Sequence, residues 1–142
     1  MARRVRARAE APDMTDATAL LTTAAPAPVG PYSQAIRSGG FIFCSGQVGL
    51  DPATGKIVAG GVAAQTAQVL DNLAAVLQAA DLTLNAIVKT TIFLVDINDF
   101  ATVNAVYAER MGTPPPARSP FAVAALPLGA RVEIEAIASA GA

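Results

Sequence analysis

Arg118 is the residue whose surroundings point most directly to chemistry. It lies between a proline run and an apolar run in PPPARSPFAVAALP, residues 114–127, and no acidic residue is near it in the sequence. The planar fork of donors on a guanidinium fits a carboxylate bidentately. Its partner is therefore either Glu133 or Glu135, or the carboxylate of a bound ligand, unless the side chain is simply exposed to water.

Glu133 and Glu135 belong to RVEIEAI, residues 131–137, in which charged and apolar residues alternate. Because side chains alternate across a β-strand, this pattern places Arg131 and both glutamates on one face and the apolar residues on the other. The charged face is either solvated or borders a cleft. In a cleft, a glutamate can hold a water molecule and take its proton.

The remaining candidates carry little weight one by one. Tyr32 follows a proline in GPYSQ, which is typical of a packing residue, and Ser45 precedes a glycine in FCSGQ, which is typical of a hydrogen bond at a strand end. Asn104 lies on the otherwise apolar face of an expected helix, where a helix–loop hydrogen bond is its usual role. Cys44 is expected in the core, because no base is available to activate it.

The composition excludes several kinds of site. The chain has 142 residues, no histidine and one cysteine. A zinc site normally takes several His or Cys ligands, and Ser-His-Asp or Cys-His catalysis needs a histidine. A single cysteine cannot form a disulfide within the chain, which fits a reducing, cytoplasmic setting.

The charge balance argues against nucleic acid as the main partner. The net charge is −1, and four of the ten basic residues lie in the first eight positions. Beyond residue 16 the chain has six basic and eight acidic residues, whereas nucleic-acid binders usually present a basic patch. Only 15% of the residues are charged and 53% are hydrophobic, which suggests that another copy of the chain covers part of the surface.

Residues 1–16 are expected to form a disordered tail, followed by a single domain over residues 17–142. The tail begins with arginines, but it lacks the continuous apolar stretch of a signal peptide and contains Glu10, Asp13 and Asp16. A basic tether to a membrane surface is the weaker alternative, because the arginines are few and close to acids. No run approaches the roughly 18 apolar residues of a membrane span.

The periodicity of apolar residues predicts an α+β fold. Three- and four-residue spacing indicates helices over 60–81 and 98–112. Segment 86–97 is rich in β-branched and apolar residues at both odd and even positions, as in a strand that is buried on both faces. The expected elements, in chain order, are a hairpin over 33–50, a helix over 60–81, a strand over 86–97, a helix over 98–112, and two strands over 118–126 and 130–138.

This order suggests one mixed sheet with a hairpin at each end and two helices on one face. The other face of the sheet would remain uncovered in a single chain. Strands that are apolar on both sides would expose that face to water. We therefore expect a closed oligomer in which the sheet faces meet.

Six segments together resemble the Rid (reactive intermediate deaminase) family, also called YjgF. They are GPYSQAI, FCSGQVGLDPATG, QVLDNLAAVLQAA, IVKTTIFLVDINDFATVNAVYAERM, PPARSPFAVAALP and VEIEAIA, and they occur in the family's order within residues 24–139. The resemblance implies a RidA-like, chorismate-mutase-like α+β fold, assembled as a homotrimer with three clefts between subunits. It also implies a site with no cofactor and no metal.

The resemblance further implies roles for particular residues. Arg118 corresponds to the arginine that holds the substrate carboxylate, and Glu133 to the acid that positions the attacking water. Tyr32, Ser45 and Asn104 match positions that line or shape the cleft.

Two more positions of the resemblance concern the backbone. Gly46 matches a position whose backbone faces the ligand, and Pro120 takes the place of a residue that is often cysteine. Proline has no N–H, so a ligand hydrogen bond from that amide, worth about 0.5–1.5 kcal/mol, would be lost. The arginine clamp would remain.

The implied activity is hydrolysis of 2-aminoacrylate-type enamines and imines to a 2-keto acid and ammonia. Such intermediates, released by pyridoxal-phosphate enzymes, hydrolyse unaided, so a positioning effect of roughly a few kcal/mol would suffice. One alternative is a non-catalytic trimer that binds small acids or regulates. Another is an endoribonuclease, which the acidic body and the lack of histidine disfavour.

Overall fold

The computed structural model describes residues 16–141, so the predicted tail over residues 1–16 lies almost wholly outside the described residues. The domain limit at residue 17 stays a prediction. The strands are β1 (Thr18–Leu20), β2 (Ala35–Ser38), β3 (Phe41–Val48), β4 (Ile87–Leu94), β5 (Ala117–Ala122) and β6 (Val132–Ser139). The helices are α1 (Gly61–Gln78) and α2 (Phe100–Arg110), with short 3-10 helices η1 (Leu84–Ala86), η2 (Ile97–Asp99) and η3 (Pro127–Gly129). The predicted α+β order is confirmed, and the three-residue β1 is added to it.

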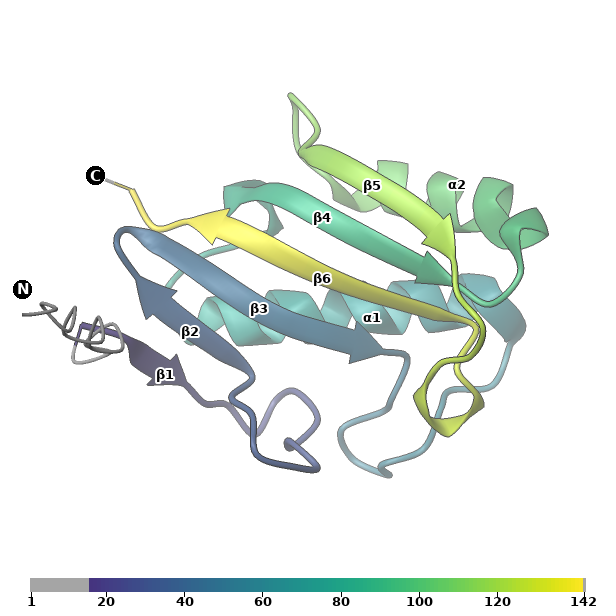
Figure 1. Cartoon of the computed structure of the whole chain (residues 1–142), viewed down its shortest axis with the longest axis horizontal. Coiled ribbons are helices and arrows are strands. Elements are labelled where there is room, and N and C mark those ends of the chain that lie inside the picture. Colours follow the sequence, from purple (N-terminus) through teal and green to yellow (C-terminus); the bar gives the residue numbers. More distant parts are fainter. Residues whose placement is uncertain (1–15, 142) are drawn as a thin grey trace, which may run out of the picture.

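All six strands form one mixed sheet in the order β1-β2-β3-β6-β4-β5 (Figure 1). β4 and β5 are parallel, and the other pairs are antiparallel. The expected C-terminal hairpin is therefore wrong. β5 pairs with β4 at one edge, whereas β6 lies between β3 and β4.

Burial and proline explain why the last two strands are not neighbours. Val132 and Ile134 of β6 are fully buried, which suits a central strand. β5 contains Pro120, which an edge strand tolerates. The N–H of Val123 donates to the carbonyl of Leu94 at 2.8 Å, so the alternation along β5 turns the nitrogen of Pro120 toward the open edge. Its missing N–H therefore breaks no bond of the ladder.

The predicted N-terminal hairpin is confirmed. Ser38 of β2 pairs with Phe41 of β3, which leaves Gly39 and Gly40 as a two-residue turn. Both glycines have positive φ, 60° and 81°. Glycine adopts this conformation without steric cost, and it suits a tight turn between twisted strands.

Both helices lie on the same face of the sheet (Figure 1). α1 packs on β3 and β6 and against α2. Both helices are predicted by the sequence, although each is shorter than its expected range. The centre of the core consists of buried aliphatic side chains from α1 and the strands, which are Val69, Leu70, Leu73, Leu77, Ile42, Ile92 and Ile134. None of the helices within residues 16–141 is long and apolar enough to cross a membrane.

The opposite face of the sheet has no helix over it. Phe41 and Phe43 of β3 and Phe121 of β5 are 44%, 46% and 46% exposed. β4 shows the same asymmetry, because Ile92 is buried under the helices and Phe93 is only partly covered. The expectation that this strand is buried on both faces is therefore not met within one chain.

Candidate active site

Arg118 extends from β5 toward α2, where three side chains hold its guanidinium. One guanidinium nitrogen donates a hydrogen bond to Oδ1 of Asn104 at 2.7 Å. The Cζ atom lies 5.1 Å from the centroid of the Tyr107 ring and 5.4 Å from that of Phe100, within the range of a cation–π interaction. The ring faces stabilise the charge without using the N–H donors of the fork.

Tyr107 is itself fixed by a buried hydrogen bond. Its hydroxyl lies 2.7 Å from Oγ1 of Thr90, and both residues are almost fully buried. Thr90 is the residue of β4 that pairs with Arg118 of β5. The position of the guanidinium therefore depends on the register between these two parallel strands.

No carboxylate of the described residues pairs with Arg118. Within residues 16–141 the ion pairs join other residues, Arg110 with Asp71 and Arg131 with Asp99. The interpretation of Arg118 as a salt-bridge partner of Glu133 or Glu135 is therefore wrong for the single chain. Its side chain is half-buried, so simple exposure does not describe it either.

Glu133 lies on the open face of the sheet, directly against Gly46 of β3. A Cβ atom at Gly46 would come within 2.9 Å of Cδ and Oε2 of Glu133, so a larger residue there would displace the carboxyl group. The pairing of β3 with β6 is irregular between Cys44 and Gln47, as in a β-bulge. Two predicted site residues, Gly46 and Glu133, are thus in contact.

Burial raises the pKa of the Glu133 carboxyl above its ordinary value, and the nearby Glu135 carboxylate raises it further. A carboxylate with a raised pKa is a better proton acceptor near neutral pH. Among residues 16–141, no group of three or more acidic or cysteine side chains could hold a metal ion.

Ser45 and Tyr32 lie in neighbouring segments next to the bulge. The Ser45 hydroxyl donates to the carbonyl of Ser33 at 2.6 Å, and its N–H donates to the carbonyl of Gln34 at 3.0 Å. Tyr32 is 51% exposed, and its hydroxyl accepts a hydrogen bond of 3.4 Å from the N–H of Val29. Ser45 thus shapes the backbone, whereas the ring of Tyr32 is open to contact.

The side chains around Arg118 and those around Glu133 form two groups on opposite faces of the sheet. The arginine group consists of Arg118, Asn104, Tyr107, Phe100 and Thr90, on the face that the helices cover. The carboxylate group consists of Glu133 and Gly46, on the open face. In the strand register, Arg118 and Glu133 are two strands and three residues apart, so their Cα atoms are roughly 14 Å apart. One small ligand cannot contact both groups of the same chain.

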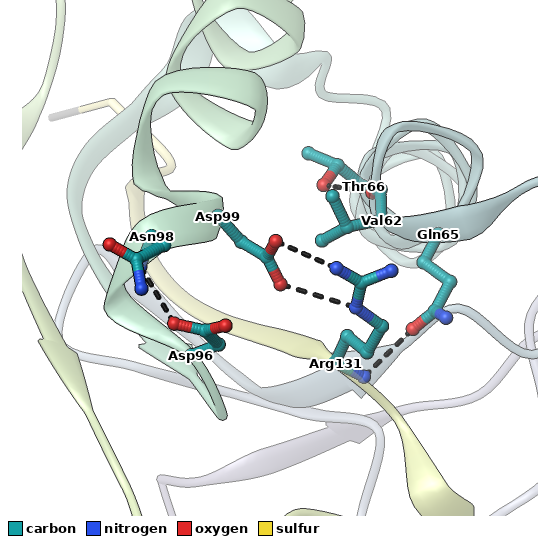
Figure 2. A network of polar contacts seen from close by, with 7 residues as sticks. All are labelled: Val62, Gln65, Thr66, Asp96, Asn98, Asp99 and Arg131. Carbon is teal, nitrogen blue, oxygen red and sulfur yellow. Dashed lines mark hydrogen bonds and ion pairs between the residues drawn. The ribbon is translucent and has the colours of Figure 1, made fainter.

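A network of polar contacts fixes the start of β6 against both helices (Figure 2). Arg131 donates to both carboxylate oxygens of Asp99, at 2.7 and 3.2 Å. Its backbone N–H donates to Oε1 of buried Gln65, in α1, at 2.9 Å. Glu133 of β6 lies two residues after Arg131, and Asn104 of α2 lies five residues after Asp99, the last residue of η2. The network therefore helps to fix where the two groups lie relative to each other.

The aromatic part of the arginine group could not be found from the sequence. Phe100 and Tyr107 lie on the face of α2 that carries Asn104, but helical spacing cannot show that Arg118 packs against that face. Thr90 gave no signal beyond being a polar residue in an apolar strand. The alternation in residues 131–137 places Arg131 among the charged residues, but no local pattern indicates its ion pair with Asp99.

Known proteins share both the sequence and this arrangement of elements. The family model described as endoribonuclease L-PSP matches residues 22–140. A mouse protein named 2-iminobutanoate/2-iminopropanoate deaminase is 53% identical over 120 residues, which is 84% of this chain and 89% of that one.

Solved structures agree with the fold. RidA from an Antarctic Psychrobacter bacterium is similar with a TM-score of 0.83 at 43% identity, over 86% of this chain and 98% of that one. The YjgF gene product of E. coli is similar with a TM-score of 0.79 at 47% identity, again over 86% and 98% of the two chains.

The hydrogen bond that fixes Tyr107 predicts a non-additive pair of variants. Thr90→Val should destabilise the fold by about 1–3 kcal/mol, because the Tyr107 hydroxyl stays buried without its partner. Adding Tyr107→Phe removes both polar groups and should recover most of that loss. Urea unfolding of both single variants and the double variant measures the coupling, and strictly additive losses would contradict this role.

The raised pKa of Glu133 predicts a pH-dependent effect on stability. The folded chain holds this proton more tightly than the unfolded chain, so the free energy of unfolding falls as the pH rises from the ordinary pKa through the raised one. Glu133→Gln cannot ionise at this position, so it avoids this fall in the free energy of unfolding. The variant should melt above wild type at neutral pH, and the ionisation should make no difference at about pH 3, below the unfolded pKa of roughly 4.3.

Thermal melts across this pH range, with the exposed Glu109→Gln as a control, test the sign of the effect. Glu109→Gln should follow wild type throughout. A Glu133→Gln variant that melts below wild type at neutral pH would show that the ionised carboxylate stabilises the fold instead.

Proposed function

Because the chain belongs to the endoribonuclease L-PSP family, which includes the Rid and YjgF proteins, we propose that it is an imine deaminase of the RidA type. It hydrolyses 2-aminoacrylate-type intermediates, namely 2-iminopropanoate and 2-iminobutanoate, to 2-keto acids and ammonia, the activity for which the mouse relative is named. The observation that carries the proposal is the state of Arg118. Its guanidinium is half-buried and oriented by Asn104, and no carboxylate within residues 16–141 pairs with it. A ligand carboxylate fits that fork.

The reaction needs positioning more than it needs strong catalytic groups. Arg118 holds the substrate carboxylate, and the enamine gains a proton at C3 to give the iminium form. Water adds to C2 while Glu133 orients it and takes one of its protons. The carbinolamine then gains a proton on nitrogen, loses its hydroxyl proton and expels ammonia, which leaves the 2-keto acid. Holding the water and the substrate together lowers the entropic part of the barrier.

The other site residues support these two. Asn104 orients the guanidinium from the side. Gly46 lets the Glu133 carboxyl lie close to the backbone, where the ligand can approach. Tyr32 presents an exposed ring to the ligand, and Ser45 keeps the adjoining backbone in place through Ser33.

Pro120 takes the place of a residue that is often cysteine in the family. Its nitrogen faces the open edge of β5, and it offers no N–H to a ligand there. Binding of the substrate carboxylate therefore depends more heavily on Arg118.

We propose that the active form is a homotrimer with its clefts between subunits. The arginine group of one chain and the carboxylate group of the next then face the same substrate, which the opposite faces of one sheet prevent within a chain. Phe41, Phe43 and Phe121 on the open face supply apolar surface for such an assembly. A single cysteine cannot form a disulfide within the chain, which fits work in the cytosol.

Two alternatives remain as outcomes of the tests. A trimer that binds small acids without turnover would keep the arginine clamp and lack hydrolysis. A ribonuclease would cleave RNA at a rate that survives repurification, although the acidic balance of residues 17–142 disfavours RNA binding.

The clamp predicts the effect of Arg118→Ala. A serine or threonine dehydratase generates the imine, and the formation of 2-keto acid is followed with and without the protein. Wild type should accelerate the reaction, and the variant should lose at least about tenfold in kcat/KM, because charged hydrogen bonds to the substrate are worth about 1.5–3 kcal/mol each. The variant should remain folded, with a melting temperature lowered only modestly by the loss of the contacts with Asn104, Tyr107 and Phe100.

Arg110→Ala is the matched control, since Arg110 pairs with Asp71 at the surface, and it should keep wild-type activity. If Arg118→Ala instead unfolds the chain, Arg118 is a structural residue. If wild type does not accelerate the reaction, the protein is not a deaminase for these imines.

The inter-subunit cleft predicts complementation between two impaired variants. Arg118→Ala and Glu133→Gln should each retain only a small fraction of wild-type activity as homotrimers. When they are unfolded together and refolded, random mixing leaves about a quarter of the clefts with both groups intact. Roughly that share of wild-type activity should return, whereas no recovery in confirmed mixed trimers would place both groups in one chain's site.

A further inference from the structure

A cavity of about 430 Å³ lies beside Arg118, between α2 and the segment that leads into β5. One wall is a stripe of α2 made of Asn104, Tyr107 and Ala108, which share a helix face because they lie three and four residues apart, and it is continued by Met111 just after the helix. The other wall is the loop that includes Pro115 and Pro116. The cavity thus continues directly from the guanidinium along the helix.

The two ends of this cavity differ in chemistry. Arg118 and Asn104 form a charged and polar end, joined by their 2.7 Å hydrogen bond. Met111 lies seven residues further along, which is about 10 Å in a helix, and the lining there is apolar with Ala108 and the prolines. Such a shape matches a small amphiphile that has a carboxylate at one end and an apolar side chain at the other.

We propose that this cavity receives the side chain of the imino acid and that Ala108 and Met111 set its preferred length. The inference rests on the proposed deaminase function and specifies its substrate class. The preferred substrates are 2-imino acids with apolar side chains of about three to four carbons. When the carboxylate of such a substrate is bound to Arg118, its side chain extends along α2. The C2 atom then remains open to Glu133 of the neighbouring chain.

The size of the cavity favours side chains larger than methyl. Its volume lies within the range of about 300–1,000 Å³ that is usual for ligand pockets. A single methyl group would leave most of the apolar lining in contact with water. Each additional methylene that is buried should improve binding roughly fourfold.

Ala108 is the position at which the cavity can be narrowed with least disturbance. It is exposed on α2, and leucine is a good helix former. Met111 also packs against the core, and Pro115 and Pro116 also line a second cavity of about 490 Å³ on the far side of the loop. Ala105, also exposed on α2 but outside the lining, provides the matched control.

The first test measures the binding of the keto-acid products by calorimetry, using pyruvate and 4-methyl-2-oxopentanoate. Wild type should bind the longer acid at least about tenfold more tightly. Ala108→Leu should reduce that ratio about fivefold or more, and Ala105→Leu should preserve it. Equal affinities in wild type, or an unchanged ratio in Ala108→Leu, would overturn the inference.

A second measurement separates this inference from the proposed function. An amino-acid oxidase generates the imines of alanine and leucine, and hydrolysis of each is followed with the same three proteins. A kcat/KM ratio that shifts in parallel with the binding ratio supports both. Hydrolysis without selectivity for length overturns only the side-chain cavity, whereas selective binding of keto acids without hydrolysis overturns the deaminase.

Discussion

A six-stranded sheet has two faces to bury, and this chain covers only one of them with helices. The site follows from that constraint. The guanidinium of Arg118 lies on the covered face, where aromatic rings and an amide oxygen are available, and Glu133 lies on the open face, where its carboxyl stays within reach of water. A guanidinium and a carboxylate close together on one face would form an ion pair. The sheet keeps them apart, so that both remain free for a ligand.

Much of this architecture could be predicted from short-range patterns in the sequence. The alternation in residues 131–137 correctly divides β6 into charged and apolar faces, and the two glycines after Ser38 mark the hairpin. The position of β6 in the sheet could not be predicted in this way. Strand order depends on which strand can be buried among distant partners, and a hairpin between consecutive strands was the simpler local interpretation. The three-residue β1 is too short to show any period.

The residues of the candidate site also differ in how well the sequence alone could predict them. Arg118 stands out in the sequence because a charged residue among apolar neighbours needs an explanation, whereas only the family resemblance distinguishes Glu133 from Glu135. Tyr107 and Thr90 do not stand out, because their contacts depend on the register between β4 and β5 and on where α2 packs against the sheet. Contacts between distant segments carry no local signature. The roles proposed for the site residues rest on the family resemblance, whereas their geometry comes from the fold.

The carboxylate group also shows what such a site costs the fold. Glu133 lies where burial and a like charge disfavour its ionised form, and Gly46 gives up a side chain so that the carboxyl can fit. Neither residue stabilises the sheet, because glycine weakens a strand and a partly buried acid opposes folding when it is ionised. Residues that are poorly suited to stability in this way are a common mark of functional sites.

Pro120 has a consequence beyond the ligand. β5 is an outer strand of the sheet, and an unpaired outer strand is a template onto which another strand can add. A proline whose nitrogen faces outward interrupts the row of donors that an incoming strand would need. The sheet is therefore hindered from growing sideways into a fibre at this edge.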